Sequence, residues 1–404
     1  MRVKIKLILL MVVVALTSQA TEFNVNTAAA IRSAFGNANA GDIITIAPGF
    51  YDLVNELSTG KNGTAEKPII VRSAGLNGYA ELKAQSQIAF RVKNKFWIFM
   101  GIHFKGSTSS TEAIVFMDGP NGCSDVLLRC CKISDSSAYG VKGAKTRAIP
   151  AHRVVFERTE LYNTQATGFD LVSGDDWRLT NNYVHDYGKG GGVSYGIFLK
   201  GGGFNGIIEG NLVDGKDQST TVGISFGGGL TGEQWLPLLP DGSLGPEHQN
   251  GIARNNIVKN TSDVAYHSNH ARYCYYYNNL AWNTGSGFQN QKPYSANTDE
   301  YPVLINNLLK GVSKAHSSSR YTVQPQTAWF INTAAGDFRL SATGIQQVMN
   351  TGELLTDNPT DLFGFKRTIA GLGPVLPGSP VTTAWSDPLT WISLRQPSTA
   401  IGFK

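Results

Sequence analysis

The polar and apolar positions of this chain repeat in a short phrase: a small or polar residue, one or two asparagines, and two apolar residues. Taking the last asparagine of each phrase, or its equivalent, as a marker places the markers at positions 102, 131, 159, 182, 211, 256, 279 and 307. Most markers lie 23–29 residues apart. Coils of this length cannot bury their apolar faces alone and must stack on one another. The pattern therefore predicts an all-β solenoid, a single-stranded parallel β-helix.

Each phrase also predicts which side chains face inward. An apolar residue stands two positions after every marker, and these residues should stack along one column of the core: Phe104, Ile133, Leu161, Val184, Val213, Val258, Ala281 and Leu309. The asparagines should lie at a corner of the coil. Asparagine tolerates turn geometry there, and its amide can bond the coils above and below.

A second strand follows within each coil, often directly after a glycine, as in Gly168-Phe169-Asp170-Leu171 and Gly223-Ile224-Ser225-Phe226. Side chains alternate along a strand, and strands of neighbouring coils lie about 4.8 Å apart. If the apolar residue after each glycine faces inward, the next residue faces outward. One outer column should therefore gather residues that are distant in sequence: Lys142, Asp170, Phe198, Ser225, His267, Gln289 and His316.

The two ends of the chain differ from the repeat. Residues 1–20 have a basic start, an apolar run and a small-residue cleavage site, which predicts a signal peptide cleaved after about Ala20. Thr27–Phe35 has a short helical pattern after a possible N-cap at Asn26, and it would cap the N-terminal end of the core. We expect the β-helix to span residues 21–340 and the Pro- and Gly-containing residues 341–404 to form an irregular cap. No second globular domain is expected.

Composition adds few constraints. Removing the three basic residues of the expected signal peptide lowers the formal net charge from +5 to about +2, which weakens any argument that overall basicity attracts a polyanion. No later segment is apolar for long enough to span a membrane. The four cysteines have no metal-type spacing. Cys123 could pair with Cys130 or Cys131 in an oxidising compartment, and Cys274 is expected to be buried or free.

Two groups on the predicted outer column carry candidate chemistry. Lys142 and Lys200 flank Asp170 on adjacent coils, which indicates either a site for a carboxylated sugar or an ion ladder of little energetic value. His267, His270 and Arg272 lie within one coil, where histidine could transfer protons and arginine could hold a carboxylate. A metal site built on these histidines would lack nearby carboxylates.

Two further features could contact a ligand. The tyrosine run that includes Tyr276 could supply a phenol or a stacking surface, or it could pack in the core. Gly227–Asn250, which contains Trp235, interrupts the solenoid with an insertion of about one coil. Long insertions in compact scaffolds are usually functional or disordered, and we expect this one to form one wall of a cleft over residues 196–272.

The stretch Ala40–Ser73, followed by Trp97–Lys105, resembles the opening of right-handed parallel β-helix polysaccharide lyases, and most closely the alginate lyase and chondroitinase B group. The resemblance covers most of the chain at the level of coils. It implies β-elimination, in which a lysine base removes the C5 proton of a uronate. The carboxylate of that uronate is neutralised by Ca²⁺ or by cationic side chains.

Carried over by position, the resemblance places Lys200 of Leu199–Gly202 where the family has the arginine of a Leu-Arg-His-Gly phrase. The base lysine of the family falls on Val172. Ca²⁺ is a possible cofactor, but acidic ligands that would hold it are not evident, and no other metal is expected. Asp170, Asp175 and Asp176 also resemble, faintly, the aspartates of β-helix polygalacturonases, but a turn before Trp177 explains the adjacent pair better.

The sequence thus predicts a right-handed parallel β-helix with an N-terminal helical cap, acting as a secreted or periplasmic polysaccharide lyase on a uronate-containing glycan. Lys200 would neutralise a carboxylate or act as base, with Lys142 as its partner, and His267, His270 and Arg272 would transfer protons and clamp the substrate. The residues expected to contact substrate are Asp170, Phe198, Ser225, Trp235, Tyr276 and Gln289. Alternative functions are a non-catalytic carbohydrate-binding or adhesion solenoid, a uronate epimerase and a glycoside hydrolase. We expect a monomer that binds an acidic polysaccharide and neither nucleic acid nor membrane.

Overall fold

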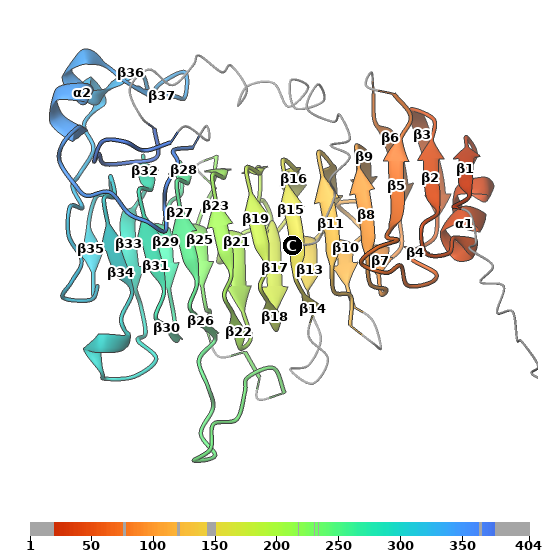
Figure 1. Cartoon of the computed structure of the whole chain (residues 1–404), viewed down its shortest axis with the longest axis horizontal. Helices are drawn as coiled ribbons and strands as arrows, with labels where there is room; N and C mark the ends of the chain where they lie inside the picture. The colour runs from red at the N-terminus through yellow and green to blue at the C-terminus, as the bar shows by residue number, and fades with distance from the viewer. Residues whose placement is uncertain are drawn as a thin grey trace, which may run out of the picture.

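The computed structural model describes residues 20–75, 78–118, 122–143, 151–216, 218–229, 231–232, 234–362 and 366–375. Its strands stack along one axis into three long parallel sheets, with the N-terminal coils at one end and the C-terminal segments at the other (Figure 1). The predicted parallel β-helix is confirmed. The predicted signal peptide lies, except for its last residue, outside the described residues.

Each full coil contributes one strand to each of three sheets, which we call sheets A, B and C. Sheet A contains β1 (Glu22–Val25), β2 (Ile43–Ile46), β5 (Ile69–Ser73), β8 (Trp97–Met100), β11 (Val126–Arg129), β15 (Val154–Glu157), β19 (Arg178–Thr180), β23 (Ile207–Glu209), β27 (Ile252–Arg254), β31 (Tyr275–Tyr277) and β34 (Val303–Ile305). Sheet B contains β3 (Gly49–Val54), β6 (Ala80–Ala84), β9 (Ile102–Lys105), β12 (Lys132–Ser136), β16 (Glu160–Thr164), β20 (Tyr183–His185), β24 (Leu212–Asp214), β28 (Ile257–Lys259) and β32 (Leu280–Trp282). Sheet C contains β4 (Leu57–Ser58), β7 (Ile88–Val92), β10 (Ala113–Met117), β13 (Tyr139–Gly143), β17 (Phe169–Val172), β21 (Ser194–Lys200), β25 (Thr221–Phe226), β29 (Val264–Ser268), β33 (Ser286–Asn290) and β35 (Val312–Ser313).

Small sheets lie at the margins of the solenoid. The turns that follow sheet C contribute two of them, β14 (Ala151–His152) with β18 (Gly174–Asp175), and β22 (Gly203–Phe204) with β26 (His248–Gln249) and β30 (Ala271–Arg272). Beyond the last coil, β36 (Phe330–Asn332) and β37 (Asp337–Leu340) form an antiparallel pair, next to η2 (Thr327–Trp329) and α2 (Ala342–Val348). A further short helix, η1 (Thr298–Glu300), lies in a late turn.

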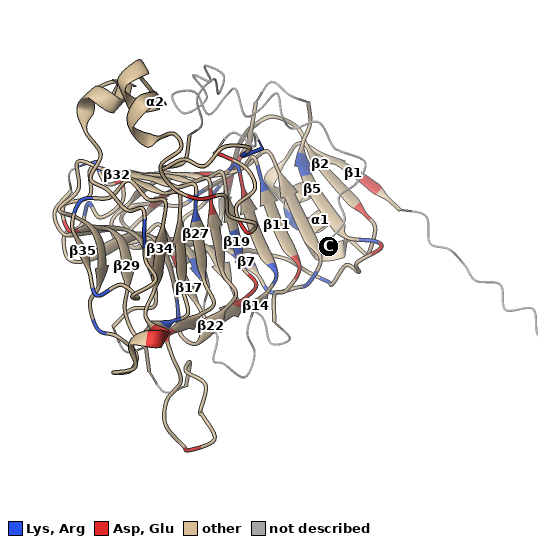
Figure 2. Cartoon of the chain, turned by 60° about the vertical axis from the view of Figure 1, so that its left-hand side comes forward, with Lys and Arg blue, Asp and Glu red and all other residues tan. Residues whose placement is uncertain are grey.

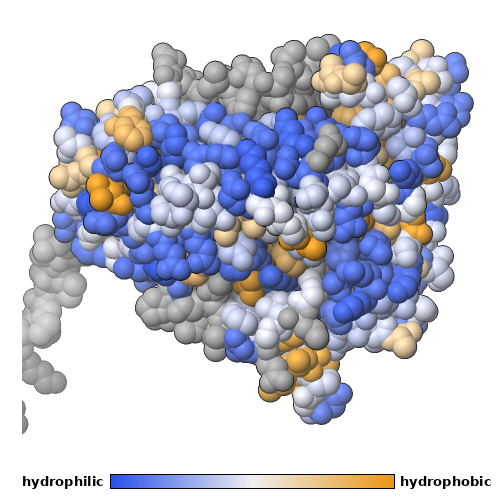
Figure 3. All heavy atoms as spheres, turned by 180° about the vertical axis from the view of Figure 1, so that it is seen from behind, coloured by the Kyte–Doolittle hydropathy of each residue, from blue (hydrophilic) through white to orange (hydrophobic). Residues whose placement is uncertain are grey.

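The inward column predicted from the asparagine phrase is present in sheet B. The residues from Phe104 to Ala281 pair in register from coil to coil, and all of them are buried. Apolar residues of the three sheets together form one continuous core along the axis. Outside this core, hydrophilic side chains cover much of the rear face (Figure 3).

The asparagines form a buried ladder at the corner between sheets A and B. The ladder consists of Asn182, Asn211, Asn256, Asn279 and Asn307. In each rung after the first, the side-chain oxygen accepts two hydrogen bonds from the asparagine one coil earlier, one from its backbone N–H and one from its side-chain amide. The residue before each of these asparagines has a positive φ, from 51° at Asn278 to 67° at Gly210. Asn and Gly adopt this left-handed conformation at low cost, which is why they recur at this corner.

The glycines that precede the sheet C strands have a steric role. A Cβ on Gly196 would lie 2.5 Å from Val213 Cγ1, and one on Gly223 would lie 2.4 Å from Val258 Cγ1. These glycines therefore face the core, as do the residues that follow them, Ile197 and Ile224. Two consecutive inward positions break the strict alternation of the strand, and this shift brings the residue before the glycine to the outer face.

The N-terminal end is capped by α1 (Ala28–Asn37), which packs Ile31 and Phe35 into the core. The predicted N-cap at Asn26 is wrong by one residue. Thr27 takes that place, and its hydroxyl accepts a hydrogen bond from the N–H of Ala30 at 3.2 Å. Neither this helix nor any other that the structure describes is long and apolar enough to cross a bilayer. The Cys123 thiol is free and buried, so the disulfide considered for it is not formed.

Candidate active site on the outer face of sheet C

The outer column predicted from the sequence is present in sheet C with one change. Strand pairing aligns, in order, Ser58, Arg91, Phe116, Lys142, Asp170, Phe198, Ser225, His267, Gln289 and Ser313. The prediction that His316 continues the column is wrong, because Ser313 of β35 takes that rung. His316 lies beyond the strand and bonds Ser318 instead.

Lys142, Asp170 and Lys200 come together on this face, and we call them the Lys–Asp–Lys group. Asp170 is only 3% exposed, and Lys142 Nζ bonds its Oδ2. Lys200 Nζ lies 3.3 Å from the other carboxylate oxygen. Lys200 belongs to the rung of Val172, as the register predicted. Charged residues of both signs lie along the strands (Figure 2). In this group two ammonium groups share one buried carboxylate and leave a net positive charge, as Lys216 and Lys259 also do at Asp214.

Aromatic rings border the Lys–Asp–Lys group. The ammonium group of Lys200 lies 4.3 Å from the ring centre of Phe198, and that of Lys142 lies 4.2 Å from the ring centre of Tyr139. Tyr195 stacks on Phe198 with ring centres 3.9 Å apart and lies 6.3 Å from the ring of His267. Tyr195 was not predicted, because strict alternation from Ile197 assigns it to the core side.

His267 is held in a defined orientation. Its Nδ1 lies 3.0 Å from Ser225 Oγ, and the hydroxyl of Ser225 donates to the carbonyl oxygen of Gly227 at 2.7 Å. The serine oxygen therefore accepts from Nδ1 of His267. Nε2 lies 3.3 Å from the side-chain oxygen of Gln291, so it can act as a base only when that amide turns or substrate displaces it. Burial lowers the pKa of His267 to about 4, although a hydrogen bond with Gln291 opposes the shift. The ring is thus neutral at neutral pH.

The phenol of Tyr195 has the opposite character. Burial raises its pKa to about 12, and the negative charges of Asp263 and Asp170 add to the effect. Tyr195 is therefore protonated where His267 is neutral. A neutral imidazole and a protonated phenol thus lie on one face with ring centres 6.3 Å apart, so that one can accept a proton and the other can donate one.

The histidine–arginine group predicted from the sequence is divided by the corner that follows β29. His270 lies at that corner with a φ of 52°, and its Nδ1 lies 3.0 Å from Asn269 Oδ1. Arg272 lies on β30 in another sheet, where it bonds Gln249 and lies 3.6 Å from a carboxylate oxygen of Glu300. The structure thus places Arg272 in a different sheet from His267, so the two do not share one outer column.

The expectation that Tyr276 contacts substrate is wrong. It is the inward residue of the three-residue strand β31, it is 0% exposed, and its hydroxyl donates to the carbonyl oxygen of His267 at 2.8 Å. Its ring cannot contact a bound glycan, and it supports the histidine strand from the core side. Gln289 stays on the outer column, one rung beyond His267, and is partly exposed.

The insertion leaves the solenoid after β25 and returns at β26, beside the C-terminal ends of the sheet C strands (Figure 1). Its base is anchored by Glu247, whose carboxylate accepts from the N–H of Gly201 at 2.8 Å and from the hydroxyl of Thr231 at 2.6 Å. A Cβ on Gly228 would lie 2.3 Å from Phe198 Cζ, so the insertion backbone packs against this ring. The carbonyl oxygen of Trp235 accepts from Ser173, next to the turn that follows Lys200. The insertion thus borders the Lys–Asp–Lys group.

Two buried neutral histidines predict a loss of stability in acid. Burial lowers the pKa of His248 to about 3 and that of His267 to about 4, against 6.5 in the unfolded chain. As the pH falls below 6.5, the unfolded state binds protons that the folded state does not, so the free energy of unfolding falls; for His267 the loss is roughly 3 kcal/mol. Denaturant unfolding between pH 7 and 4 should show the free energy of unfolding falling with pH. In His267→Asn, unfolding should take up one proton fewer, so the slope against pH should be smaller. An unchanged slope in the variant would contradict the assignment.

A second polar group lies on the outer face of sheet B. Lys132 and His185 both contact Glu160, at 2.9 and 3.2 Å, and His185 stacks on Tyr162. Burial would raise the pKa of Glu160, but hydrogen bonds from His185 and Lys132 outweigh it and lower that pKa. Because each charge here already has an opposite partner, the cluster has the character of a structural ion network rather than of a site awaiting a ligand.

The described residues do not fit a Ca²⁺ site. Among them, no three His, Cys, Asp or Glu side chains are grouped so that they could hold a metal ion. The buried carboxylate on the sheet C face, Asp170, is already paired with two ammonium groups. Ca²⁺ requires several oxygen ligands, and the described residues of this face do not supply them.

Comparison with known proteins places the fold. Residues 113–327, more than half of the chain, match the family model described as right handed beta helix region. None of the curated proteins compared with the chain matches it in sequence. The structure is similar to pectate lyase Pel9A, with a TM-score of 0.56 and 15% identity over 86% of this chain and 90% of that chain.

Two weaker similarities are to a rhamnogalacturonan lyase, with a TM-score of 0.48 and 15% identity over 81% of this chain and 98% of that chain, and to an alginate lyase from Paenibacillus sp. str. FPU-7, with a TM-score of 0.44 and 16% identity over 75% and 99%. At these identities, the likeness to Pel9A supports the architecture and not a particular activity. The right-handed β-helix expected from the sequence is confirmed.

Proposed function

This chain belongs to the right-handed β-helix family, and we propose that it is an exported polysaccharide lyase that cleaves a uronate-containing glycan on the outer face of sheet C. The observation that carries the proposal is the meeting of two ammonium groups on the buried carboxylate of Asp170, on the same outer face as an oriented neutral imidazole and a protonated phenol. Export rests on the signal peptide expected in residues 1–20. N-terminal sequencing of protein recovered outside the cytoplasm should begin near Thr21, and retention of Met1 would contradict export.

The proposed reaction assigns one task to each group. Lys200, with Lys142 behind it, binds the uronate carboxylate and so stabilises the negative charge that develops when the C5 proton leaves. Nε2 of His267 accepts that proton. The electron pair forms the C4–C5 double bond as the bond from C4 to the glycosidic oxygen breaks, and the phenol of Tyr195 protonates the departing oxygen. This assignment uses Lys200 to bind the carboxylate and gives the role of base to His267.

The proposal is tested by incubating the protein with polygalacturonate, alginate and chondroitin sulfate while recording the ultraviolet absorbance of the unsaturated uronate product. We expect absorbance to grow on one of these polymers. In Lys200→Ala we expect kcat/KM to fall about 100-fold, because a charge-stabilising donor is removed from the transition state. Lys67→Ala, which removes an exposed lysine at the N-terminal end, is the matched control and should leave the rate unchanged.

The other outcomes distinguish the alternatives. New reducing ends without absorbance would identify a hydrolase, and exchange of the C5 hydrogen without cleavage would identify an epimerase. Binding without any reaction would identify a carbohydrate-binding solenoid. Full activity in Lys200→Ala would remove the Lys–Asp–Lys group from the site.

A further inference from the structure

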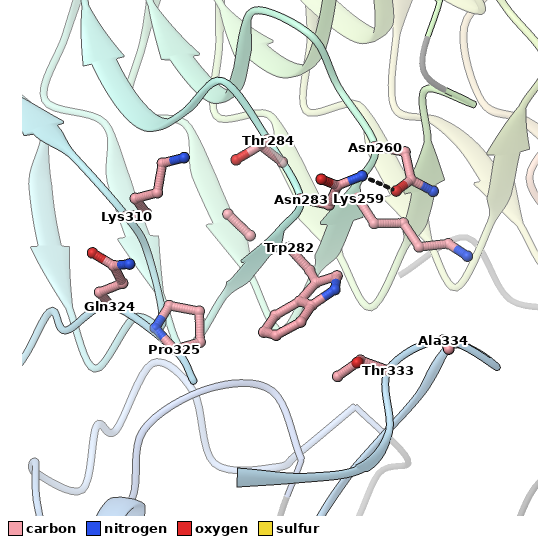
Figure 4. Close-up of a pocket in the computed structure, with 11 residues that line it drawn as sticks. Lys259, Asn260, Trp282, Asn283, Thr284, Lys310, Gln324, Pro325, Thr333 and Ala334 are labelled. Atoms are coloured by element: carbon pink, nitrogen blue, oxygen red, sulfur yellow. Dashed lines mark hydrogen bonds between the residues drawn. The ribbon is translucent and has the colours of Figure 1, made fainter. Parts of the chain in front are cut away.

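A pocket of about 480 Å³ opens on the outer face of sheet B near the C-terminal end of the solenoid (Figure 4). The late coils contribute Lys259, Trp282 and Lys310 to it, and the segments that follow contribute Gln324 and Thr333. None of these residues belongs to the outer column of sheet C. The pocket is therefore separate from the candidate active site, and its volume is within the range of small-ligand sites.

Trp282 forms the apolar part of the pocket. It ends β32 on the rung next to Lys259, and its ring lies between the Lys310 and Thr333 sides of the pocket (Figure 4). Edge contacts with Phe330, at 5.5 Å between ring centres, and with Phe338, at 5.9 Å, hold the ring in place. The indole is nevertheless partly exposed. A fixed ring that keeps solvent access is a platform for a flat or amphipathic ligand.

The polar part of the pocket is cationic. Lys310 is exposed, and no described residue bonds its ammonium group; the same holds for the side chain of Gln324. Lys259 adds a second ammonium group, although it is shared with Asp214 at 3.1 Å. No acidic residue lines the pocket among the residues that the structure describes. The pocket therefore favours a ligand that carries a negative charge.

The wall beside Lys259 carries ordered amides (Figure 4). Asn283 donates to the side-chain oxygen of Asn260 at 2.8 Å, and Asn260 donates to Asp214 at 2.9 Å. Both asparagines have positive φ, of 50° and 55°, at stacked corners of the coils. This chain of hydrogen bonds fixes the two amides at the pocket wall, where the hydroxyl of Thr284 adds another polar group. Fixed amides and hydroxyls are suited to hydrogen bonding the hydroxyl groups of a sugar.

From this combination we infer that the Trp282 pocket is a second glycan-binding site, which takes one acidic sugar residue. The ring face of the sugar would lie on Trp282, its carboxylate would pair with Lys310, and its hydroxyls would meet Asn283 and Gln324. The choice of a uronate as the acidic sugar rests on the proposed function. A polymer held here and on the sheet C face at once would gain avidity, because the second contact is intramolecular.

The test is calorimetric titration of the full chain with trigalacturonate and with a mannuronate trisaccharide, using cellotriose as the neutral probe. The Lys200→Ala background slows turnover about 100-fold and weakens binding on the sheet C face. We expect one acidic trisaccharide to bind, and Lys310→Glu to weaken it about tenfold, since it replaces a charge-assisted bond with repulsion. Lys67→Glu makes the same charge change at the N-terminal end and should have no effect. Trp282→Phe, which keeps an aromatic ring against Phe330 and Phe338, should weaken binding about threefold.

The pocket assignment would be overturned if neither acidic trisaccharide bound, if Lys310→Glu bound as tightly as its parent, or if cellotriose bound equally well. These outcomes are independent of catalysis. If Lys310→Glu weakens binding while the wild-type protein forms no unsaturated product, the lyase proposal fails and the pocket stands. If product forms and Lys310→Glu does not alter binding, only the pocket fails.

Discussion

Replacing His267 with asparagine is expected to lower the kcat of the proposed elimination about 1000-fold while leaving the fold intact. The amide nitrogen of asparagine can take the place of Nδ1 and keep the hydrogen bond to Ser225 Oγ, which is 3.0 Å long in the wild-type protein. What the variant lacks is the Nε2 lone pair, the atom assigned to remove the C5 proton. Because substrate binding relies on Lys142 and Lys200, KM should change little.

The measurement is the initial rate of ultraviolet absorbance on the polymer that the wild-type protein cleaves, together with thermal unfolding of both proteins. Ser225→Ala is the companion variant: it keeps the imidazole and removes its orienting partner, so we expect a loss of only about tenfold. If His267→Asn raised KM at constant kcat, the histidine would be a binding residue. A wild-type rate would exclude it from the reaction.

Replacing Asn256 with alanine is expected to lower the free energy of unfolding by about 4 kcal/mol. The Asn256 side-chain oxygen accepts from the backbone and the amide of Asn211, at 2.9 and 3.0 Å, and its amide donates to Ile208 O and to Asn279 Oδ1. All of these groups are buried, so alanine would leave donors and an acceptor without partners in the middle of the ladder. Each buried polar group left unsatisfied costs about 1–3 kcal/mol.

Denaturant unfolding of the wild-type protein and the variant checks this value. Asn283→Ala is the matched control, because Asn283 is exposed and its amide donates to the side chain of Asn260 at the surface. Its effect should stay below about 1 kcal/mol. Equal losses in the two variants would show that the buried ladder contributes no more than a surface amide.

The two proposed sites show how a solenoid brings residues that are distant in sequence onto one face. Asp170 and His267 are 97 positions apart in sequence but only three rungs apart on sheet C, about 14 Å at the spacing of adjacent strands. The Trp282 pocket arises on another side of the same coils. An acidic polymer could therefore contact both without any domain movement, and a structure of this kind can bind and cleave with different faces.

Most of the architecture follows from the sequence because it depends on a regular period. The asparagine phrase sets the length of a coil, and strand alternation then predicts both the inward apolar column and the outward order of Lys142, Asp170, Phe198, Ser225 and His267. The same register brings Lys200 and Lys142 to one carboxylate. These are local or repeating relations, so a single sequence is enough to predict them.

Where the period fails, only the tertiary structure decides. Two inward positions at Gly196 and Ile197 bring Tyr195 to the outer face, and the corner after β29 sends Arg272 to a different sheet from His267. The register of a three-residue strand buries Tyr276. The Trp282 pocket depends on segments beyond the last coil that pack against β32, and no repeat encodes that contact. The sequence by itself determined the coil, its ladder and the order of one outer column, because stacking repeats a single spacing. The structure decided which side chains meet at corners and ends, because turn geometry and packing between distant segments set those positions.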